Sequence, residues 1–504
     1  MKGCLLLQRR FVFIGHELVK IMRERHGITD WCAYVTTRSS WDWLRAQTDV
    51  PYSHLVFEAD IYRQYQTEKL DLPYLRALER DYGIPNLWPF LNTDRVIRYN
   101  LLRRSYPSDT SVYTHEEMLR LLQATARAAI KFLDEAKPDF IIFSVVANLS
   151  GLLLYYVAKK RGIKTIVMDA PRIGIRYFVS ERYDASTYLA AAFAALRQQH
   201  DAAAEELRQP ARRWLQEFQA RPTYYLHNSP AAAAFSPRVA PRSEYFNWLL
   251  PSRAPRSLRW FLKSFWDYAR NPYRDDYDTI KPWHEVYDKL IRKLRILRGY
   301  GDLYDYPAPG EKYAYFALHT EPEAYPIILA PFYTDQQWLI SQVARSLPVE
   351  YKLYVKDHPG MYGLRPRRYY RELKKIPNVR LVPPGYSGFD LIQGSDLTIT
   401  ITGTSAWEAV LLKKPVVTFG PMYYSSLSMV KQCRAIAELP YLIKEQLENF
   451  RYDEAELVDF IAACLAESVE VDLVQLWDIE GGSRLAEHRE ELARLAGLIA
   501  GKVR

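Results

Sequence analysis

Small polar residues interrupt the apolar stretch LTITITGTSAWEAVLLKKPVVTFG, residues 397–420, at Thr402, Gly403, Thr404 and Ser405. Glycine permits a tight turn and a close approach of the backbone to a ligand, and hydroxyl groups donate hydrogen bonds. If a helix begins here, its first amide N–H groups have no acceptor within the helix and carry the positive end of its dipole. Such a helix start is suited to bind an anion, most often a phosphate.

Two elements have to position these residues for the site to form. Alternating Thr and Ile predict a strand over 396–402, and the run that follows predicts a helix over 404–413. The alternative is a purely structural capping box, because Ser405 and Glu408 have the S/T-x-x-E spacing. Capping does not explain why the neighbouring residues are also small, so we interpret the turn as a phosphate site.

A histidine follows a second predicted strand, in the sequence LYVKDHPG at 353–360. Pro359 restricts the backbone and holds His358 in an extended conformation after the strand, which also carries Lys356. Histidine can donate to a phosphate oxygen or protonate a leaving group near neutral pH. A loop histidine without a role is the alternative. We predict that Lys356, His358 and Pro359 contact the bound ligand, with His358 also catalytic.

An imidazole and two carboxylates follow a third predicted strand, in the sequence ALHTEPEAYP at 317–326. We predict that His319 contacts the ligand, and that Glu321 and Glu323 are candidates for catalysis, because paired carboxylates can divide the roles of acid and base. Exposed loop acids without a catalytic role are the alternative.

A loop rich in proline and glycine, PPGYSGFDLIQGSD at 383–396, precedes the strand of the phosphate turn. Backbone groups near Tyr386 and Ser387 are suited to meet the edge of a nucleotide base. These two residues are therefore predicted to bind the nucleotide.

In the first half of the chain, FVFIGHELVK predicts a strand over 10–15 that exposes His16 and Glu17 at a helix start. The sequence VMDAPRIG places Asp169 after a strand over 164–170 in the same way. Each of the three is a candidate general base. A helix N-cap role is the alternative for Glu17 and for Asp169.

Strands and helices alternate along both halves, which predicts an α/β fold class of two facing Rossmann-like domains. The predicted strands lie at 10–15, 31–37, 53–59, 139–146, 164–170, 312–319, 350–358, 379–384, 396–402 and 415–420. The predicted helices lie at 115–136, 182–220, 334–346, 367–375, 404–413, 453–468 and 481–504.

At 504 residues the chain can hold more than one core, since single cores stop growing at ~250–300 residues. We predict an N-terminal Rossmann-like domain over 1–235 and a basic, aromatic-rich helical linker or insertion over 236–300. A C-terminal Rossmann-like domain is predicted over 301–480. The last segment, 481–504, is predicted as a helix that can cross back to the N-terminal domain.

The composition predicts a soluble, cytoplasmic protein. The four cysteines are scattered without a C-x-x-C pair, which fits a reducing compartment and gives no sign of structural zinc. Residues 140–158 carry no charge, but Asn148, Ser150 and Gly151 interrupt them. This stretch therefore predicts a strand, a turn and a helix up to about Lys160 rather than a membrane span.

Positive charge is concentrated in one segment, because residues 238–300 hold 14 Lys or Arg against 7 Asp or Glu, out of a net charge of +9 for the chain. Aromatic residues are interleaved with this charge in RSLRWFLKSFWDYARNPYR. The mixture favours an anionic partner, either the inner face of the cytoplasmic membrane or a polyanionic product. The alternative is a surface insertion with snorkelling arginines. No nucleic-acid-binding module accompanies the charge, so nucleic acid is not expected as a partner.

Taken in order, five marks resemble the capsular polysaccharide biosynthesis glycosyltransferases, the group that includes the bacterial Kdo transferases of capsule assembly. The marks are HTEPEA, FYTDQQWLISQVARSLP, LYVKDHPG, GFDLIQGSDLTITITGTSAWEAVLLKKPVVTFG and the MYY that follows, within 310–425. The resemblance implies a GT-B fold, with the donor nucleotide held by the C-terminal domain and the acceptor by the N-terminal one. It also implies a CMP-activated sugar as the donor.

Carried over by position, the resemblance implies that His358 contacts the donor phosphate together with Thr404 and Ser405, and that Glu408 lies near the ribose. Two departures bear on the identity of the donor. Trp407 stands where relatives often carry a smaller residue, and HTEPEA replaces a more usual Gln before Pro-Glu.

The resulting hypothesis is a metal-independent glycosyltransferase without a required cofactor. It would move a Kdo- or sialic-acid-like sugar from a CMP-linked nucleotide-sugar to a capsular or other surface glycan or glycolipid. The alternatives are a CDP-alcohol phosphotransferase of the teichoic-acid type, a nucleotide-sugar epimerase of GT-B form, and a non-catalytic glycan-binding or export scaffold. The phosphotransferase is disfavoured because its usual Asp-Tyr-Ser-Ser motif is absent from this sequence.

Overall fold

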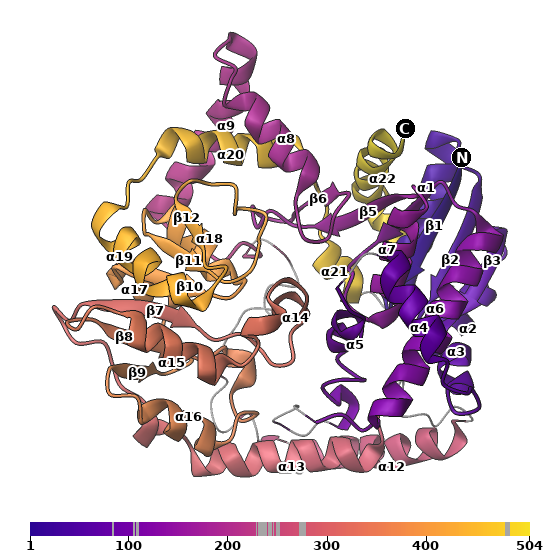
Figure 1. The fold of residues 1–504 in the computed structure, drawn as a ribbon, viewed down its shortest axis with the longest axis horizontal. Helices are drawn as coiled ribbons and strands as arrows, with labels where there is room; N and C mark the ends of the chain where they lie inside the picture. The colour runs from indigo at the N-terminus through magenta and orange to yellow at the C-terminus, as the bar shows by residue number, and fades with distance from the viewer. Residues whose placement is uncertain are drawn as a thin grey trace. The chain divides into compact units, whose positions relative to one another are not determined.

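The chain forms two compact units, each with its own parallel or largely parallel sheet (Figure 1). Unit 1 comprises Met1–Asp94, Tyr113–Ser236 and Asp453–Arg504, and unit 2 comprises Arg95–Val112 and Pro237–Tyr452. This computed structural model describes residues 1–82, 85–103, 106, 110–227, 229, 239, 244, 246–247, 252–271, 279–478 and 484–504.

The sheet of unit 1 has seven strands in the order β13-β6-β5-β4-β1-β2-β3. From β1 to β5 all pairings are parallel, whereas β6 pairs antiparallel with β5 and with β13. The strands are β1 (Lys2–Leu7), β2 (Asp30–Val35), β3 (Tyr52–Phe57), β4 (Phe140–Phe143), β5 (Lys164–Asp169), β6 (Arg176–Ser180) and β13 (Ser468–Glu470). The strand order reverses between β1 and β4, as in a Rossmann-type sheet.

The helices of unit 1 pack on the faces of its sheet or extend beyond it (Figure 1). They are α1 (Phe11–His26), α2 (Arg38–Arg45), α3 (Glu58–Gln64), α4 (Leu72–Tyr82), α5 (Trp88–Thr93), α6 (His115–Ala136), α7 (Leu149–Lys160), α8 (Thr187–Leu196), α9 (Ala202–Ala220), α20 (Glu454–Ala466), α21 (Leu473–Asp478) and α22 (Arg489–Val503). The long helix α6 begins in a complete capping box formed by Thr114 and Glu117, which satisfies two of the amide groups at its start.

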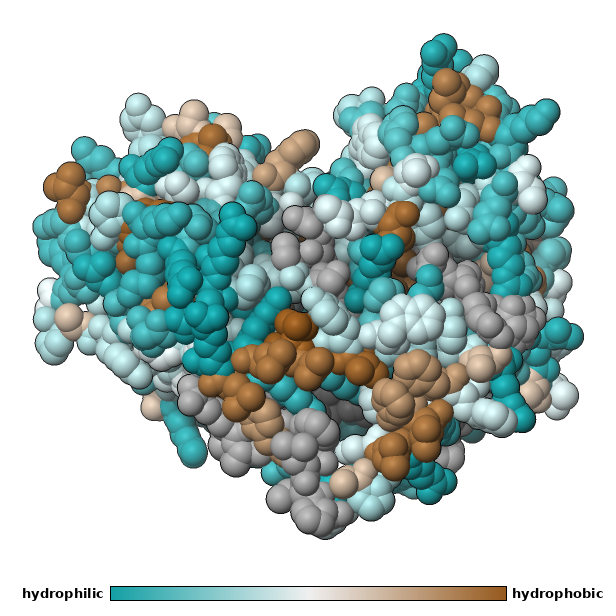
Figure 2. All heavy atoms as spheres, turned by 90° about the horizontal axis from the view of Figure 1, so that it is seen from below, coloured by the Kyte–Doolittle hydropathy of each residue, from teal (hydrophilic) through white to brown (hydrophobic). Residues whose placement is uncertain are grey.

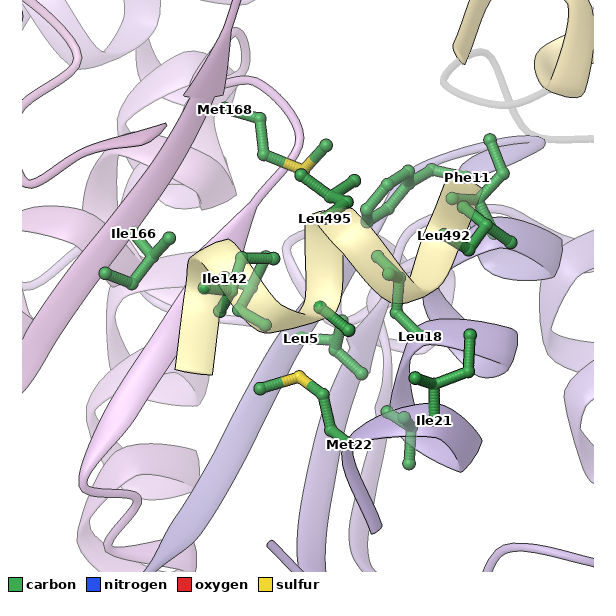
Figure 3. Close-up of a cluster of buried hydrophobic side chains, with 14 of the residues drawn as sticks. Leu5, Phe11, Leu18, Ile21, Met22, Ile142, Ile166, Met168, Leu492 and Leu495 are labelled. Atoms are coloured by element: carbon green, nitrogen blue, oxygen red, sulfur yellow. The ribbon is translucent and has the colours of Figure 1, made fainter. Parts of the chain in front are cut away.

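The last 52 residues complete unit 1 although they follow unit 2 in the sequence. Figure 3 shows Leu492 and Leu495 of α22 packed beside Phe11 and Leu18 of α1, in a core where all four side chains are fully buried. On the surface of the same pair of helices Arg25 forms an ion pair with Glu490. Helix α22 therefore closes the core that α1 and the sheet begin.

The sheet of unit 2 has six strands, all parallel, in the order β12-β11-β10-β7-β8-β9. The strands are β7 (Tyr313–Ala317), β8 (Lys352–Lys356), β9 (Val379–Val382), β10 (Leu397–Thr400), β11 (Val416–Thr418) and β12 (Val430–Gln432). Numbered along the chain this is the order 3-2-1-4-5-6 of the Rossmann fold, with its switch point between β7 and β10.

The helices of unit 2 pack on its sheet or extend from it (Figure 1). They are α12 (Ala254–Arg270), α13 (Pro282–Arg298), α14 (Ala324–Leu329), α15 (Gln336–Ser346), α16 (Arg367–Lys374), α17 (Gly388–Gly394), α18 (Thr404–Leu411) and α19 (Leu439–Asn449). The described parts of the predicted basic insertion are thus two helices, α12 and α13.

The structure confirms the predicted α/β fold class. It has two Rossmann-like sheets, which is the organisation of a GT-B-type fold. One predicted strand is wrong: residues 10–15 begin helix α1, and the strand is Lys2–Leu7. Two apolar runs flank Arg9 and Arg10, and either has the composition of a strand. The second run becomes helical because its apolar residues recur at the spacing of a helix and bury one face.

The division into units also differs from the predicted bounds. Residues 95–112 and the two basic helices belong to unit 2, and the return to unit 1 begins at Asp453 instead of 481. Helix α20 causes the earlier return, because it packs against α8 and α9, where Arg208 and Asp459 form a buried ion pair of 2.6 Å.

The uncharged stretch 140–158 forms β4, a turn and α7, as predicted. Over the described ranges, no helix combines the length and the hydropathy that crossing a bilayer requires.

Candidate functional site

The predicted site residues of the second half follow neighbouring strands of unit 2. His319 follows β7, the turn at Gly403 follows β10, and His358 follows β8. These three strands are adjacent in the order β10-β7-β8, and all are parallel. The residues therefore share the carboxyl edge of the sheet, at and beside its switch point, where ligands of open α/β sheets bind.

His319 connects the ends of β7 and β10. Its Nε2 lies 3.3 Å from the amide nitrogen of Thr402 and 3.2 Å from Oγ1 of Thr400, and its Nδ1 lies 3.0 Å from a carboxylate oxygen of Glu323. A backbone N–H can only donate, so Nε2 accepts and the ring proton of neutral His319 sits on Nδ1, facing Glu323. His319 thus orients the turn that precedes Gly403.

Glu323 is a charged partner shared by both histidines. Its carboxylate accepts from His319 and, at 3.2 Å, from the hydroxyl of Thr320. Burial raises the pKa of Glu323, but the hydrogen bond from His319 and the charges of His319 and His358 outweigh it, so the pKa lies below its ordinary value. Glu323 is therefore ionised at neutral pH and is a weak base.

His358 presents one ring nitrogen to solvent. Its Nδ1 accepts a hydrogen bond of 3.1 Å from the amide of Gly360, so in the neutral ring the proton is on Nε2 of this exposed side chain. Desolvation lowers the pKa of His358, Glu323 partly restores it, and Lys356 lowers it further. At neutral pH the imidazole is a neutral donor until an anion binds nearby. Pro359 follows it buried and begins a single 3₁₀ turn.

Helix α18 begins without a side-chain cap. Its N-cap is Gly403, and Thr404 and Ser405 are its first two residues, so the capping-box alternative is wrong. Within the described part of the chain, the buried hydroxyls of Thr402 and Ser405 have no hydrogen-bond partner. A buried polar group without a partner costs about 1–3 kcal/mol, which indicates a ligand that pairs with it.

Glycine is required at the turn because the backbone comes close to three side chains. A Cβ on Gly403 would lie 2.5 Å from Oγ1 of Thr400, 3.2 Å from Oγ of Ser405 and 3.5 Å from Cε1 of His319. The backbone of this turn therefore lies directly against the His319 ring, which brings the helix start and the imidazole into one group.

Glu408 and Lys356 are half-buried, and the charge of each affects the pKa of the other. Burial raises the pKa of Glu408 to about 8, and the charge of Lys356 counteracts only part of this. Burial also lowers the pKa of Lys356, against the opposite effects of Asp357 and Glu408. Glu408 is therefore protonated at neutral pH and can donate a hydrogen bond, for which a ligand hydroxyl or phosphate oxygen is a suitable acceptor.

The pKa of Glu408 predicts how stability changes with pH. The folded protein holds this proton up to about pH 8 and the unfolded chain only up to about 4.5, so stability falls as the pH rises between these values. Urea denaturation between pH 5 and 7 would measure this effect. With rising pH, the free energy of unfolding of wild type should fall more steeply than that of Glu408→Gln, by about 1.4 kcal/mol per pH unit. Glu445→Gln, on an exposed face of α19, should follow wild type. Equal slopes for wild type and Glu408→Gln would contradict the protonated state.

The sequence analysis missed Arg365, which is fully buried beside the site. Its guanidinium contacts Asp357, lies 3.3 Å from Glu321 and donates to the carbonyl oxygen of His319 at 2.7 Å. Tyr106 also joins this network, because its hydroxyl donates to Glu321 and accepts from Arg365 at 3.3 Å. The carboxylate of Glu321 is thus held in place by Arg365 and Tyr106.

A pocket of about 770 Å³ opens in unit 2 over this network. Three predicted residues line it, namely His319, Glu321 and Glu323. Residues not predicted from the sequence complete the lining, among them Arg98, Tyr99, Tyr106, Asp335, Gln336, Arg368 and Tyr369. His358 and the Gly403 turn are outside this lining and lie beside its His319–Glu323 wall.

The loop of Tyr386 and Ser387 follows β9, one strand further from the switch point. Ser387 is the N-cap of α17 and accepts from the amide of Asp390 at 3.2 Å. Tyr386 is half-buried near Tyr313. The capping hydrogen bond explains why a serine stands at position 387. The backbone of this loop remains suited to contact a nucleotide base.

His16 and Glu17 do not lie at a strand's carboxyl end, which corrects the prediction. Both are inside helix α1, because the strand ends before it begins. Buried His16 bonds through both ring nitrogens, at 2.9 Å to Asp49 and 3.0 Å to the hydroxyl of Tyr52, the first residue of β3. Glu17 pairs with Lys20 at 3.1 Å. These contacts are structural and lie at the amino-terminal edge of the sheet.

Asp169 ends β5 at the carboxyl edge of unit 1, as predicted, with one oxygen accepting from the amide of Ala170. The switch point of this sheet, between β1 and β4, carries residues that the sequence analysis missed. Buried Glu58 accepts from Ser150 and, at 3.5 Å, from Asn148, which in turn accepts from Gln8 at 3.1 Å. The misplacement of the first strand hid Gln8, the residue that directly follows β1.

Comparison with known proteins finds a family model that matches part of unit 2. Residues 333–445 match the family model described as "Capsule polysaccharide biosynthesis protein", which confirms the resemblance seen in the sequence. The matched segment contains His358, Arg365, the turn at Gly403 and Glu408. No curated protein matches the chain.

Solved structures are similar to the chain at low identity. The "beta Kdo 2,7 transferase" of Thermosulfurimonas dismutans KpsC is 13% identical, with 79% of this chain and 95% of that chain covered and a TM-score of 0.37. The "beta Kdo 2,4 transferase" of the same protein is 11% identical, covering 67% and 82%, with a TM-score of 0.37. The UDP-GlcNAc 2-epimerase of Neisseria meningitidis is 11% identical, covering 92% and 100%, with a TM-score of 0.26.

Proposed function

We propose that this protein is a glycosyltransferase of capsule polysaccharide biosynthesis that takes its sugar from a nucleotide-activated donor held by unit 2. The match of residues 333–445 to the capsule polysaccharide biosynthesis family supports the assignment. The observation that carries it is the start of α18, an uncapped helix N-terminus where two buried hydroxyls have no hydrogen-bond partner among the residues that the structure describes. A donor phosphate bound there would supply the missing acceptors.

The surrounding residues divide the work of holding the donor. His358 Nε2–H is a donor for a non-bridging oxygen of the leaving phosphate, and anion binding would raise the lowered pKa of this imidazole and favour its cationic form. Lys356 adds positive charge, and protonated Glu408 can donate to a ribose hydroxyl. Stabilising the charge that develops on the leaving phosphate lowers the barrier to transfer.

Glu321 and Glu323 serve in this proposal as positioning residues. Glu321 is tied to Arg365 and Tyr106, and Glu323 has a lowered pKa that makes it a poor proton acceptor. Efficient general bases have a pKa near the working pH. The base that activates the acceptor hydroxyl would therefore come from another residue, for which Asp169 is the predicted candidate that lies at a carboxyl edge.

The finer points of the proposal rest on the family resemblance. The donor is a CMP-sugar with a Kdo- or sialic-acid-like group, and the acceptor is a capsular or other surface glycan or glycolipid. The reaction takes place in the cytoplasm at the inner face of the membrane. It needs no metal, because the helix start, His358 and Lys356 meet the phosphate charge, so turnover should be retained in EDTA.

A nucleotide panel tests the donor site. We expect CMP to raise the melting temperature more than CDP, UDP or GDP, since a bound ligand stabilises by mass action. Ser405→Ala should leave the free protein at least as stable as wild type, because the hydroxyl has no partner to lose within the described part of the chain. The variant should need at least ten times more CMP for the same rise in melting temperature. Ser395→Ala is the matched control: this buried serine donates to the carbonyl of Ile392 at 2.9 Å.

The control variant should lose about 1 kcal/mol of stability and keep the CMP response. Hydrolysis or transfer of the sugar from a CMP-sugar would then identify a transferase. A response to CDP with turnover of CDP-glycerol would indicate the phosphotransferase, and turnover of a UDP-sugar to its epimer would indicate the epimerase. No response to any nucleotide would refute the donor site.

A further inference from the structure

Helix α13 is attached to unit 2 by one of its faces. Ile296 is fully buried, and the guanidinium of Arg295 donates to the carbonyl oxygen of Leu364. A Cβ on Gly363 would lie 2.8 Å from Ile296 and 3.4 Å from the carbonyl oxygen of Arg292, so the loop at 363–365 lies directly against this face. Apart from Ile296 and Pro282, the residues of α13 are half-buried or exposed.

The free face of α13 carries a stripe of large apolar side chains at alternating spacings of four and three residues. Its members are Trp283, Tyr287, Leu290, Leu294 and Leu297, which are between 47% and 56% exposed. On a helix this spacing aligns them along one side, and the middle of that side faces away from Ile296. We call this set the α13 stripe.

Helix α12 continues the apolar surface, and within its described residues no side chain is buried. Five of its large apolar side chains gather on one side, namely Leu258, Phe261, Leu262, Phe265 and Trp266, whereas Trp260 lies on the opposite side. We call this set the α12 stripe. Figure 2 shows hydrophobic side chains gathered over these two helices on one face of the molecule.

Positive charge borders both stripes. Helices α12 and α13 together hold nine Lys or Arg against three Asp or Glu. On α12 the basic side chains Arg256, Arg259 and Lys263 lie next to the apolar side, on the adjoining part of the helix circumference. Two of the basic side chains form cation–π contacts: Arg270 lies 4.0 Å from the ring centre of Trp266, and Lys289 lies 3.2 Å from that of Trp260.

We propose that the α12 and α13 stripes form a surface that docks on a bilayer containing anionic lipids, with both helices lying in the interface. An interfacial helix buries an apolar face among acyl chains and places Lys and Arg at the headgroups. Trp and Tyr are the aromatic residues enriched at that depth. The inference is independent of the nucleotide site, because no described residue of the two stripes lines the pocket or approaches the Gly403 turn.

A second copy of the chain is a poorer occupant of this surface. Pairing two copies through the stripes would bring two clusters with the same net positive charge together, and like charges repel at such an interface. An anionic bilayer supplies the opposite charge along with an apolar layer. Charge complementarity therefore favours the membrane.

Vesicle binding by the full chain tests the surface. Wild type should co-sediment with vesicles of phosphatidylcholine and phosphatidylglycerol, bind pure phosphatidylcholine vesicles much less, and be released as salt is raised. Leu290→Gln with Leu294→Gln should lower partitioning about 100-fold, at about tenfold per leucine. Arg256→Gln with Arg259→Gln and Lys263→Gln should also lower it about 100-fold, since each basic residue contributes about fivefold.

Matched controls change similar residues elsewhere on the surface. Leu207→Gln removes an exposed leucine of α9, and Lys131→Gln removes an exposed lysine of α6. Both should bind vesicles as wild type does. Because the substituted stripe residues are about half exposed, circular dichroism should report unchanged helix content.

Three results would overturn the proposal. Equal binding to neutral and anionic vesicles, or to neither, would show that this surface does not dock on anionic bilayers. Loss of binding in the charge variant with full binding in the leucine variant would indicate a polyanion surface instead. A dimer in light scattering that becomes a monomer in the leucine variant, without vesicle binding, would assign the stripes to a second copy.

Discussion

Replacing His358 with alanine is expected to lower the kcat of sugar transfer by about 10²–10⁴-fold, the usual range for a residue that donates a proton or hydrogen bond to the reacting group. Its Nε2 is the proton-bearing nitrogen of an exposed side chain at the carboxyl end of β8. Alanine removes that donor from the leaving phosphate. Steady-state kinetics with a CMP-sugar donor and a glycan acceptor would measure the loss.

Folding should not change in this variant, because the His358 side chain makes only one hydrogen bond within the described residues, the local one from the amide of Gly360. His115→Ala, at the exposed start of α6, is the control and should retain full turnover. A His358→Ala enzyme with near-normal kcat would remove this residue from the catalytic group. A fall in the folded fraction by circular dichroism would assign it a structural role.

Replacing Arg365 with methionine is expected to destabilise the protein by about 3–5 kcal/mol. The fully buried guanidinium contacts the carboxylates of Asp357 and Glu321 and the carbonyl oxygen of His319. Methionine has a similar length but no charge, so it would leave these groups buried without their partner. Urea denaturation of the wild type and the variant would measure the difference in free energy of unfolding.

A second substitution separates the loss of charge from the loss of packing. Asp357→Asn in the Arg365→Met background removes one unpaired carboxylate and should restore part of the stability, since neighbouring residues of a network are not additive. Arg371→Met, on an exposed position of α16, should change stability by less than about 0.5 kcal/mol. An Arg365→Met protein as stable as wild type would show that the network contributes nothing to folding.

Elements with strong local signals could be predicted from the sequence. Helix α6 was expected over 115–136 and begins at His115, because Thr114 and Glu117 close its first turn locally. Strand 10–15 could not be distinguished from β1 by composition alone, since two apolar runs compete and only the helical spacing of the second decides. The strands β6, β12 and β13 were missed because such short runs carry little period-2 signal, and β13 in addition pairs with β6, which lies far earlier in the chain.

The candidate site was predictable where its residues directly follow strands. His319, His358 and the Gly403 turn have this placement, and parallel pairing brings them to one edge. Arg365 and Tyr106 were not predictable, because neither follows a strand and Tyr106 meets Glu321 across 215 residues of sequence. The protonated state of Glu408 likewise depends on burial, which no local pattern indicates.

The position of α22 has a consequence for the biosynthesis of the protein. Arg25 and Glu490, which pair across α1 and α22, are 465 residues apart, so α1 leaves the ribosome long before the helix that covers its apolar side. Until then Phe11, Leu18 and their neighbours lack a cover, and such surfaces bind chaperones or aggregate. The nascent chain therefore has to shield its first helix throughout translation.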